Sequence, residues 1–355
     1  MSAHPTSASV TEEWEGKYLS PFAARAGESR GRAVPEKPCS LRTCFQRDRD
    51  RIVHSKSFRR LKHKTQVFIA PEGDHYRTRL THTLEVSGIS RTAARALRLN
   101  EDLAEAISLG HDLGHTPFGH IGEEALSASL KSRTGRVFEH NHQSLRVVRR
   151  LEHAGRGLNL CAEVEDGILR HTGPDLPETL EGRIVRIADR IAYVNHDVDD
   201  ALRAGIIKAA DLPAGARFLG DSCSARIDGL VHDLVESSFE NNDIVMSPPM
   251  REAMDSLRNF LFEKVYLGSV ASREMGRVRN VIEGLFEYCS ENPETLPEWS
   301  LTGGDDLHTV VSDYIAGMTD RYAIRVFKRL FIPSEWPPRG GEAAGDGQEK
   351  GQGRH

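Results

Sequence analysis

The chain has 355 residues, of which 38% are hydrophobic and 28% charged, and its formal net charge is −5. A chain of this length can bury a sizeable core, and the composition is that of an ordinary soluble protein. The net negative charge argues against a protein that holds nucleic acid by bulk electrostatics. No secretory signal, no apolar run of about 20 residues and no CxxC spacing appears, so we expect a cytoplasmic protein without a membrane span. Its five cysteines are then reduced thiols, at Cys39, Cys44, Cys161, Cys223 and Cys289.

The first 38 residues mix Ser, Ala, Gly and Pro with charged residues. We predict a flexible N-terminal arm over 1–38, with Trp14, Tyr18 and Phe22 docking on the core or on a neighbouring subunit. The next segment, 47–64, carries eight Lys or Arg against two Asp. It is either a charged surface helix or a basic wall that guides a polyanionic substrate.

Helical spacing of apolar residues dominates the rest of the chain. Helices are predicted around 47–64, 79–98, 101–113, 121–131, 141–152, 162–171 and 177–203, within a core of residues 39–205. After a break near 212–215 the helical pattern resumes, without evident catalytic residues, in a C-terminal subdomain of residues 206–332. The Gly- and Glu-rich tail 333–355 is predicted to be disordered. No βαβ alternation or glycine-rich phosphate loop is present, so the fold is predicted to be all-α and a P-loop or Rossmann nucleotide site is disfavoured.

The richest stretch for chemistry runs from residue 111 to residue 123. It opens with the pair His111-Asp112, which can offer an imidazole nitrogen and a carboxylate oxygen to one divalent ion. His115 follows one helical turn later and points the same way. A proline and a glycine break this turn, and a helix then presents His120 and Glu123 as a pair. This pattern predicts a metal site beside a proton-handling pair, which is hydrolase chemistry.

Two other segments can complete such a site. Arg79 and His82 lie three residues apart and share a helix face, so a phosphate-binding cation and a ligand would be neighbours. In the helix predicted over 177–203, an apolar stripe consists of Leu180, Ile184, Ile187, Ile191 and Val194. The opposite face carries Asp189, Tyr193, His196, Asp197 and Asp200. A metal-ligand role is favoured for Asp189, whereas a solvated face is favoured for Asp199 and Asp200.

Together these segments resemble the HD-domain phosphohydrolases, whose metal pattern is H…HD…D. The closer resemblance is to the deoxyguanosine triphosphate triphosphohydrolase-like family. It rests on six strings that occur in family order, at residues 46–61, 77–86, 111–123, 138–141, 167–171 and 189–200. The resemblance covers roughly residues 15–205 and implies an HD-domain helical bundle. It also implies one divalent metal ion (Mg, Mn, Co, Ni, Fe or Zn) held by His82, His111, Asp112 and Asp189.

The resemblance further implies that water attacks the α-phosphorus of a deoxynucleoside triphosphate (dNTP), which releases a deoxynucleoside and inorganic triphosphate. His120 and Glu123 would activate or orient that water, and His115 would contact phosphate or protonate the leaving oxygen. Residues expected to bind substrate are Arg79 and Arg190 at phosphate, Tyr193 at the deoxyribose, and Gln66 and Asp197 in the sugar pocket. Some relatives carry Lys where this chain has Arg190, which keeps the charge but changes the geometry.

The remaining histidines leave alternatives open. His140 and His142 could assist protonation, although His142 replaces what is usually a small residue. Structural or surface roles are favoured for His54, His63, His75, His171 and His196. The resemblance also implies a homo-oligomer, often a hexamer, and a nucleotide effector or single-stranded DNA as further partners.

Two rival functions belong to other classes. One is another HD hydrolase, such as a nucleoside monophosphatase, a cyclic-nucleotide phosphodiesterase or an alarmone hydrolase. These share the metal pattern but lack the strings around His120 and Glu123 and around Asp189 and Tyr193. The other is a regulatory protein that binds nucleotide or single-stranded DNA without turnover, against which the intact set of ligands and proton-handling residues argues.

Overall fold

A computed structural model describes residues 6–66, 77–239, 241–266, 269–297 and 304–333. Over these ranges the chain is helical and contains no strand, and its β-type pairing is limited to the isolated bridges Arg32–Cys161 and Thr65–Thr78. This confirms the all-α prediction. No helix in the described ranges combines the length and apolarity needed to cross a membrane. The predicted disordered tail and His75 lie outside the described residues, apart from Pro333.

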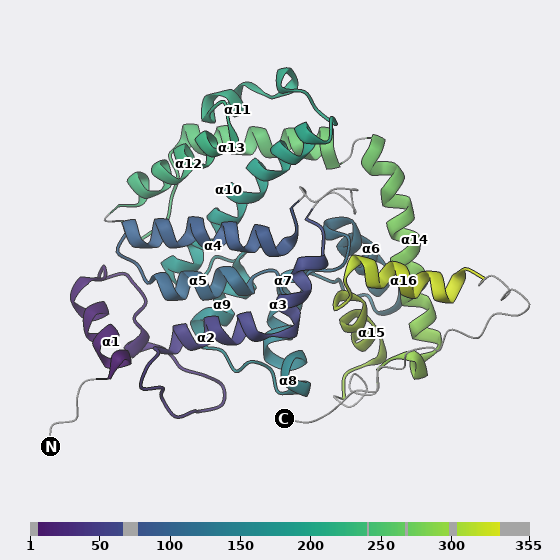
Figure 1. Cartoon of the computed structure of the whole chain (residues 1–355), viewed down its shortest axis with the longest axis horizontal. Coiled ribbons are helices and arrows are strands. Elements are labelled where there is room, and N and C mark those ends of the chain that lie inside the picture. Colours follow the sequence, from purple (N-terminus) through teal and green to yellow (C-terminus); the bar gives the residue numbers. More distant parts are fainter. Residues whose placement is uncertain (1–5, 67–76, 240, 267–268, 298–303, 334–355) are drawn as a thin grey trace, which may run out of the picture.

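The helices follow one another along the whole chain (Figure 1). Those up to residue 203 are α1 (Ser7–Tyr18), α2 (Cys44–His54), α3 (Lys56–Arg60), α4 (Arg79–Ala96), α5 (Glu101–Gly110), α6 (Gly119–Thr134), α7 (His140–Arg146), α8 (Glu152–Gly155), α9 (Ala162–Arg170) and α10 (Leu180–Arg203). The later ones are α11 (Ala214–Leu219), α12 (Cys223–Ser238), α13 (Pro248–Leu261), α14 (Ser269–Glu291), α15 (Leu307–Ala316) and α16 (Asp320–Phe331). Short π-helical turns, η3 (Val147–Leu151) and η5 (Phe262–Tyr266), follow α7 and α13.

Helices α4, α5 and α10 pack against one another at the centre of the molecule (Figure 1). Each begins at a residue whose side chain accepts a backbone N–H of the first turn, namely Thr78, Asn100 and Thr179. The apolar stripe predicted for α10 is buried at Leu180, Ile184, Ile191 and Val194, while Ile187 is partly buried. Packing of this apolar stripe holds α10, which carries Asp189, against α4, which carries His82.

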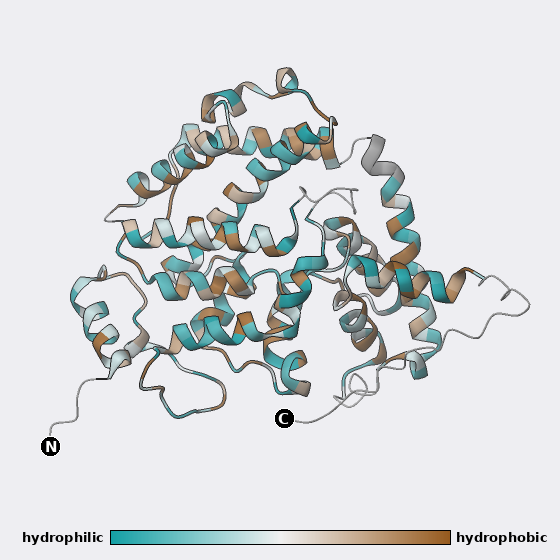
Figure 2. Ribbon diagram, viewed as in Figure 1, coloured by the Kyte–Doolittle hydropathy of each residue, from teal (hydrophilic) through white to brown (hydrophobic). Residues whose placement is uncertain are grey.

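The buried apolar residues form three clusters. One lies between α4, α10 and helices α11–α13, and a second joins α2, α5 and α9 to the other sides of α4 and α10. A third joins α6 to α14, α15 and α16. The hydropathy colouring shows brown residues along the facing sides of these helices (Figure 2). The helices expected as one C-terminal subdomain therefore contribute to two different cores, and the division of the chain into domains stays a prediction.

Several helix boundaries differ from the prediction, and the helix expected over 141–152 is α-helical only to Arg146, where the π-helical turn η3 follows. The helix expected over 47–64 is interrupted at Ser55, whose backbone is extended and whose hydroxyl caps the following helix α3. Helix α6 begins at Gly119 rather than at residue 121, because Phe118 and Gly119 adopt left-handed φ angles of 64° and 60° that turn the chain. A Cβ on Gly119 would lie 2.8 Å from the carbonyl oxygen of Gln66, so the turn also requires close backbone contact.

The N-terminal segment expected as a flexible arm contains α1, and its Glu15 side chain is buried. The Glu15 carboxylate accepts the backbone N–H of Ala26 and the side-chain amide of Asn100, so α1 is attached to the start of α5. The side chains of Trp14, Tyr18 and Phe22 do not dock on the core, since they are exposed in the single chain, and their docking on a neighbouring subunit stays a prediction.

Three of the eight basic residues of segment 47–64 pair with neighbouring acids. Arg47 and Arg51 pair with Glu36, and Arg49 pairs with Asp50 and lies 3.3 Å from Glu105. For the part of the segment that lies in α2, these ion pairs favour the charged surface helix over the basic wall. Lys64 is a separate case, because it is buried beside the candidate site.

Candidate active site

The four predicted metal ligands converge from three central helices. His82 comes from α4, His111 and Asp112 follow α5, and Asp189 comes from α10. Ligand atoms of His82, His111 and Asp112 all lie within 4.8 Å of one another. The Asp189 Oδ1 atom lies 3.0 Å from His82 Nε2 and 3.8 Å from His111 Nε2.

The donor set fits a divalent transition metal. His111 Nδ1 lies 2.6 Å from the carbonyl oxygen of Ser108, so this nitrogen carries the proton and Nε2 presents a lone pair. That Nε2 atom is buried without a hydrogen-bond partner among the described residues. A buried imidazole lone pair beside two carboxylates is the arrangement that a metal ion satisfies.

Arg79 lies directly beside this quartet. Its Nη1 atom donates to Asp112 Oδ2 at 2.6 Å, and both side chains are buried. Burial alone would raise the pKa of Asp112, but Arg79 and the neighbouring histidines hold it well below its usual range. Asp112 is therefore ionised, and Nε and Nη2 of Arg79 remain without protein acceptors in the described structure. Those two donors suit a phosphate group.

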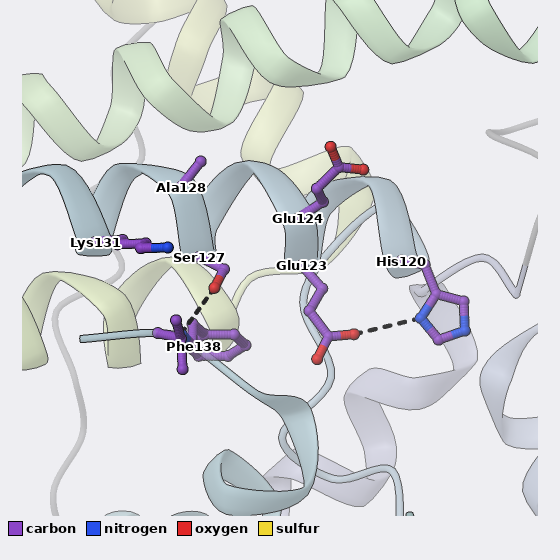
Figure 3. A pocket seen from close by; sticks show the side chains of 8 residues that line it. His120, Glu123, Glu124, Ser127, Ala128, Lys131 and Phe138 are labelled. Carbon is purple, nitrogen blue, oxygen red and sulfur yellow. Dashed lines mark hydrogen bonds and ion pairs between the residues drawn. The ribbon is translucent and has the colours of Figure 1, made fainter. Parts of the chain in front are cut away.

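The predicted proton-handling pair, His120 and Glu123, lies at the start of α6, where the two side chains face each other (Figure 3). The Oε2 atom of Glu123 lies 3.3 Å from His120 Nδ1 and 3.7 Å from His115 Nε2. Its Oε1 atom accepts the backbone N–H of His140 and lies 2.8 Å from His140 Nδ1. Burial would raise the pKa of Glu123, but His140 and His120 keep it far below the ordinary value. One ionised carboxylate thus orients two imidazoles, His120 and His140, and lies close to a third, His115.

These imidazoles differ in exposure. The His120 side chain is 70% exposed and borders an open pocket of about 420 Å³ that also contacts Glu123, Lys131 and Phe138 (Figure 3). His115 is fully buried, and burial together with Arg79 holds its pKa well below the ordinary value. His115 is therefore neutral, and its Nε2 has no hydrogen-bond partner within the described ranges.

His140 and His171 extend the cluster beyond the predicted set. The ring of His140 stacks on His115 with centroids 4.7 Å apart, and its Nε2 atom lies 3.2 Å from His171 Nε2. His171 is 2% exposed and lies 5.0 Å from His111, centroid to centroid. The prediction of a structural or surface role for His171 missed this placement.

His54, His63 and His142 lie apart from this cluster, whereas the ring of His196 lies edge to face with that of His82, with centroids 6.5 Å apart. His142 is largely exposed and 3.6 Å from Glu139, so it does not join His140. His54 and His63 are exposed, and His196 is buried 2.9 Å from Glu85. Asp200 is also buried, contrary to the solvated face expected for it, because it pairs with Arg77 at 2.9 Å.

The predicted substrate residues lie on two sides of the metal ligands. On α10, Arg190 and Tyr193 are partly buried, while Asp197 is buried two turns after Asp189. Burial raises the pKa of Tyr193 to about 12 and that of Asp197 to about 7. Gln66 is buried beyond α3, and its Oε1 atom has no partner among the described residues.

Sequence reasoning also missed Tyr266 and Lys64. The Tyr266 hydroxyl, in the C-terminal half where no catalytic residue was expected, donates to Asp197 Oδ2. Lys64 Nζ donates to the main-chain carbonyls of His115 and Ala316, which joins the site loop to the end of α15. A tyrosine at helical spacing and a lysine in a basic run carry no signal that separates them from ordinary packing or surface residues.

The fold and the site define an HD-domain phosphohydrolase. The family model for the HD domain matches residues 79–194, and the model for a phosphohydrolase-associated domain matches residues 244–329. A phosphohydrolase structure from Bacteroides thetaiotaomicron shares the fold, with a TM-score of 0.51 and 17% identity, over 80% of this chain and 69% of that one.

Closer relatives place the chain within that class. A deoxyguanosinetriphosphate triphosphohydrolase-like protein of Caldanaerobacter subterraneus subsp. tengcongensis is 56% identical over 330 residues, which is 92% of this chain and 96% of the relative. A protein of the same name from Clostridium perfringens strain 13 is 48% identical over 334 residues, which is 91% of this chain and 96% of that protein. The chain belongs to the deoxyguanosinetriphosphate triphosphohydrolase-like family of HD-domain proteins.

Proposed function

We propose that this protein hydrolyses deoxynucleoside triphosphates, dGTP or several dNTPs, to a deoxynucleoside and inorganic triphosphate. The observation that carries the proposal is the position of Glu123, which contacts three imidazoles directly beside the His82, His111, Asp112 and Asp189 quartet. Metal binding and proton transfer are thereby available at one place. The names of the relatives support the choice of substrate.

A divalent ion held by the quartet would polarise a phosphoryl oxygen and offset its negative charge. Arg79 binds phosphate through Nε and Nη2, the two donors that Asp112 leaves free. Arg190 adds positive charge one residue after Asp189. His115 presents a neutral Nε2 atom to the same region, and Tyr193 faces the deoxyribose together with Gln66 and Asp197.

His120 and Glu123 handle the proton. Glu123 accepts Nδ1–H of His120, which leaves His120 Nε2 free to take a proton from water or to donate one. The water oxygen forms the new bond to the α-phosphorus while the bond from phosphorus to the 5′ oxygen breaks. The proton lost by water compensates the proton gained by the 5′ oxygen, so the products are a neutral 5′-hydroxyl and intact triphosphate.

Product analysis tests this proposal directly. Metal-loaded protein is incubated with each dNTP alone and in pairs, in ¹⁸O-labelled water, and the products are separated. Label in a terminal phosphate group of triphosphate, with none in the nucleoside, is expected. A dNMP or dNDP as primary product would contradict the triphosphohydrolase assignment. A rate that rises only with a second dNTP would identify a nucleotide effector.

Two substitutions separate the roles within the site. Asp112→Ala is expected to lose bound metal and turnover together, whereas His120→Ala should keep both metal and nucleotide yet lose about 10²–10⁴-fold in rate. His142→Ala is the matched control, because His142 is close in sequence to His140 but exposed and outside the cluster. An Asp112→Ala protein with full metal content and near-normal rate would refute the ligand assignment.

We also propose a homo-oligomer, in line with the expectation for this family. The exposed Trp14, Tyr18 and Phe22 side chains offer apolar contacts to another copy. Light scattering should show a mass above that of the 39.5 kDa chain at micromolar concentration. A monomer under those conditions would count against the proposal.

A further inference from the structure

We propose that Cys44 and Cys161 form a site of reversible oxidation, at which a hydroperoxide converts the two thiols into a disulfide bond. Both cysteines are free thiols in the structure. Cys161 belongs to the apolar cluster that joins α2, α5 and α9, and Cys44 packs against that cluster. This inference goes beyond the proposed hydrolase activity, because neither cysteine belongs to the metal ligands or to the residues expected to bind substrate.

The two cysteines begin helices that are far apart in the sequence. Cys44 is the first residue of α2, and Cys161 is the N-cap residue of α9. The Asp48 carboxylate, one turn after Cys44, accepts the backbone N–H of Cys161 at 2.7 Å. The start of α9 is thereby held against the first turns of α2.

Arg32 holds the same two segments together from the N-terminal part of the chain. Its backbone pairs with that of Cys161 in an isolated antiparallel bridge, and its guanidinium donates to the main-chain carbonyl of Cys44 at 2.9 Å. The guanidinium also forms an ion pair with Asp48, and both of these side chains are buried. Contacts that do not involve sulfur therefore fix the two cysteines next to each other.

The two thiols are also in contact. The Cys161 thiol donates a hydrogen bond to the Cys44 sulfur, and the protonated Cys44 thiol can donate to the carbonyl oxygen of Ala26 at 3.4 Å. The hydrogen bond between the thiols lowers the pKa of Cys44, whereas the same bond and burial raise the pKa of Cys161. Cys44 is therefore the thiol that ionises and reacts first.

Access to solvent divides the pair in the same way. Cys44 is partly exposed, whereas Cys161 is fully buried. A small oxidant can reach the Cys44 sulfur, and Cys161 then reacts with the oxidised Cys44 rather than with the oxidant. A reactive thiolate with a second thiol beside it is the usual arrangement of a cysteine that oxidises reversibly.

The chemistry takes two steps. The Cys44 thiolate attacks one oxygen of the hydroperoxide, the O–O bond breaks, and the products are a sulfenic acid at Cys44 and an alkoxide or hydroxide that takes up a proton. The Cys161 sulfur then attacks the Cys44 sulfur, and the thiol proton leaves with the sulfenic hydroxyl group as water. The two sulfur atoms lose the two electrons that the peroxide gains, and a dithiol reductant reverses the change.

Peptide mapping tests the proposal. The full-length protein is treated with hydrogen peroxide, alkylated, digested with trypsin without reduction, and analysed by mass spectrometry. Cys44 and Cys161 fall in separate tryptic peptides, 43–47 and 157–170. We expect a disulfide between these two peptides, a loss of two of the five thiols of the chain, and recovery of both thiols with dithiothreitol.

Cys161→Ser separates the two steps. Serine cannot resolve the sulfenic acid, so Cys44 should accumulate as the sulfenic acid, which dimedone traps, and then oxidise further to the sulfinic acid. Cys44→Ser should leave Cys161 reduced after the same treatment. Cys39→Ser is the matched control, because Cys39 is the nearest other cysteine in the sequence and its loss should leave the disulfide unchanged.

Two results would overturn this site. Peptides 43–47 and 157–170 that stay separate in the peroxide-treated wild type would show that Cys44 and Cys161 do not form a disulfide. A disulfide between Cys39 and Cys44, or between two chains, would place the oxidation elsewhere. Both results are obtained with the wild-type protein, so they do not depend on whether a variant folds.

Discussion

Glu181 should make the stability of this protein depend on pH in a predictable direction. It is fully buried in the first turn of α10, where its Oε1 atom accepts the backbone N–H groups of Asn100 at 2.9 Å and Ala24 at 3.0 Å. Its Oε2 atom has no partner in the described structure. Burial raises the pKa of Glu181 to about 7, although the backbone hydrogen bonds oppose that rise and nearby Glu15 adds to it.

The sign of the effect follows from the raised pKa. The folded state binds the Glu181 proton more tightly than the unfolded state, where the pKa is near 4.5. The stabilisation is therefore complete below pH 4.5 and is lost as the pH rises towards 7. At about 1.4 kcal/mol per pH unit, the gap between these pKa values amounts to about 3 kcal/mol.

Glu181→Gln tests this reasoning. Glutamine keeps a carbonyl acceptor for the two backbone N–H groups and carries no charge at any pH. We expect the variant to exceed the wild type in free energy of unfolding by up to about 3 kcal/mol above pH 7, and to match it below pH 4.5. Glu287→Gln, at an exposed position in α14, should show no such dependence.

Urea unfolding followed by circular dichroism at intervals from pH 4 to 8 gives the free energy difference at each pH. A difference between wild type and Glu181→Gln that stays constant over this range would refute a raised pKa at Glu181. The result bears on the site as well, because Glu181 joins the N-terminal segment and the start of α5 to the helix that carries Asp189.

Three further substitutions test contacts around the site. Gly114→Ala would place a Cβ atom 2.1 Å from the backbone nitrogen of Ser144. We therefore expect the free energy of unfolding to fall by about 1–3 kcal/mol and the metal content to decrease. An unchanged melting temperature would contradict this close packing. Tyr266→Phe leaves the buried Asp197 carboxyl without its hydrogen-bond donor. The steady-state kinetics of dNTP turnover should then show a raised KM with a smaller change in kcat. Unchanged kinetics would argue against a role for Asp197 in the sugar pocket. Lys64→Met removes two hydrogen bonds to main-chain carbonyls and should cost about 1–3 kcal/mol in thermal or urea unfolding, whereas full stability would show that those carbonyls find other donors.

The helices and the first metal site could be predicted because their signals are local. The apolar stripe of α10 and the caps at Thr78 and Asn100 depend on residues a few positions apart. Because His111 and Asp112 are consecutive in the sequence, their side chains must lie close together, and the sequence alone therefore indicates a shared metal site. The break at Ser55 was missed because an extended residue between two basic helical patterns leaves hydropathy unchanged.

The rest of the site depends on contacts between distant segments. His140 and His171 are 31 residues apart, and Tyr266 and Asp197 are 69 apart, so no sequence period relates them. Whether such a histidine is a ligand or a packed core residue is decided by where its Nδ1 proton points. That direction is set by the end of α9 and by Glu123, neither of which a pattern in one segment contains.

The buried charges around the cluster argue for cations as part of the native site. Asp112, Asp189 and Glu123 are ionised carboxylates, because nearby cations and histidines hold their pKa values low, and Arg79 is the guanidinium among them. With the imidazoles counted as neutral, which is the form that binds a metal ion, three negative charges against one positive leave an excess of two in a region shielded from water, and this is costly without a counter-ion. One divalent ion makes this group neutral. A metal ion in the quartet therefore removes the repulsion that these carboxylates would exert on the triphosphate of the proposed substrate, and Arg79 then supplies the attraction.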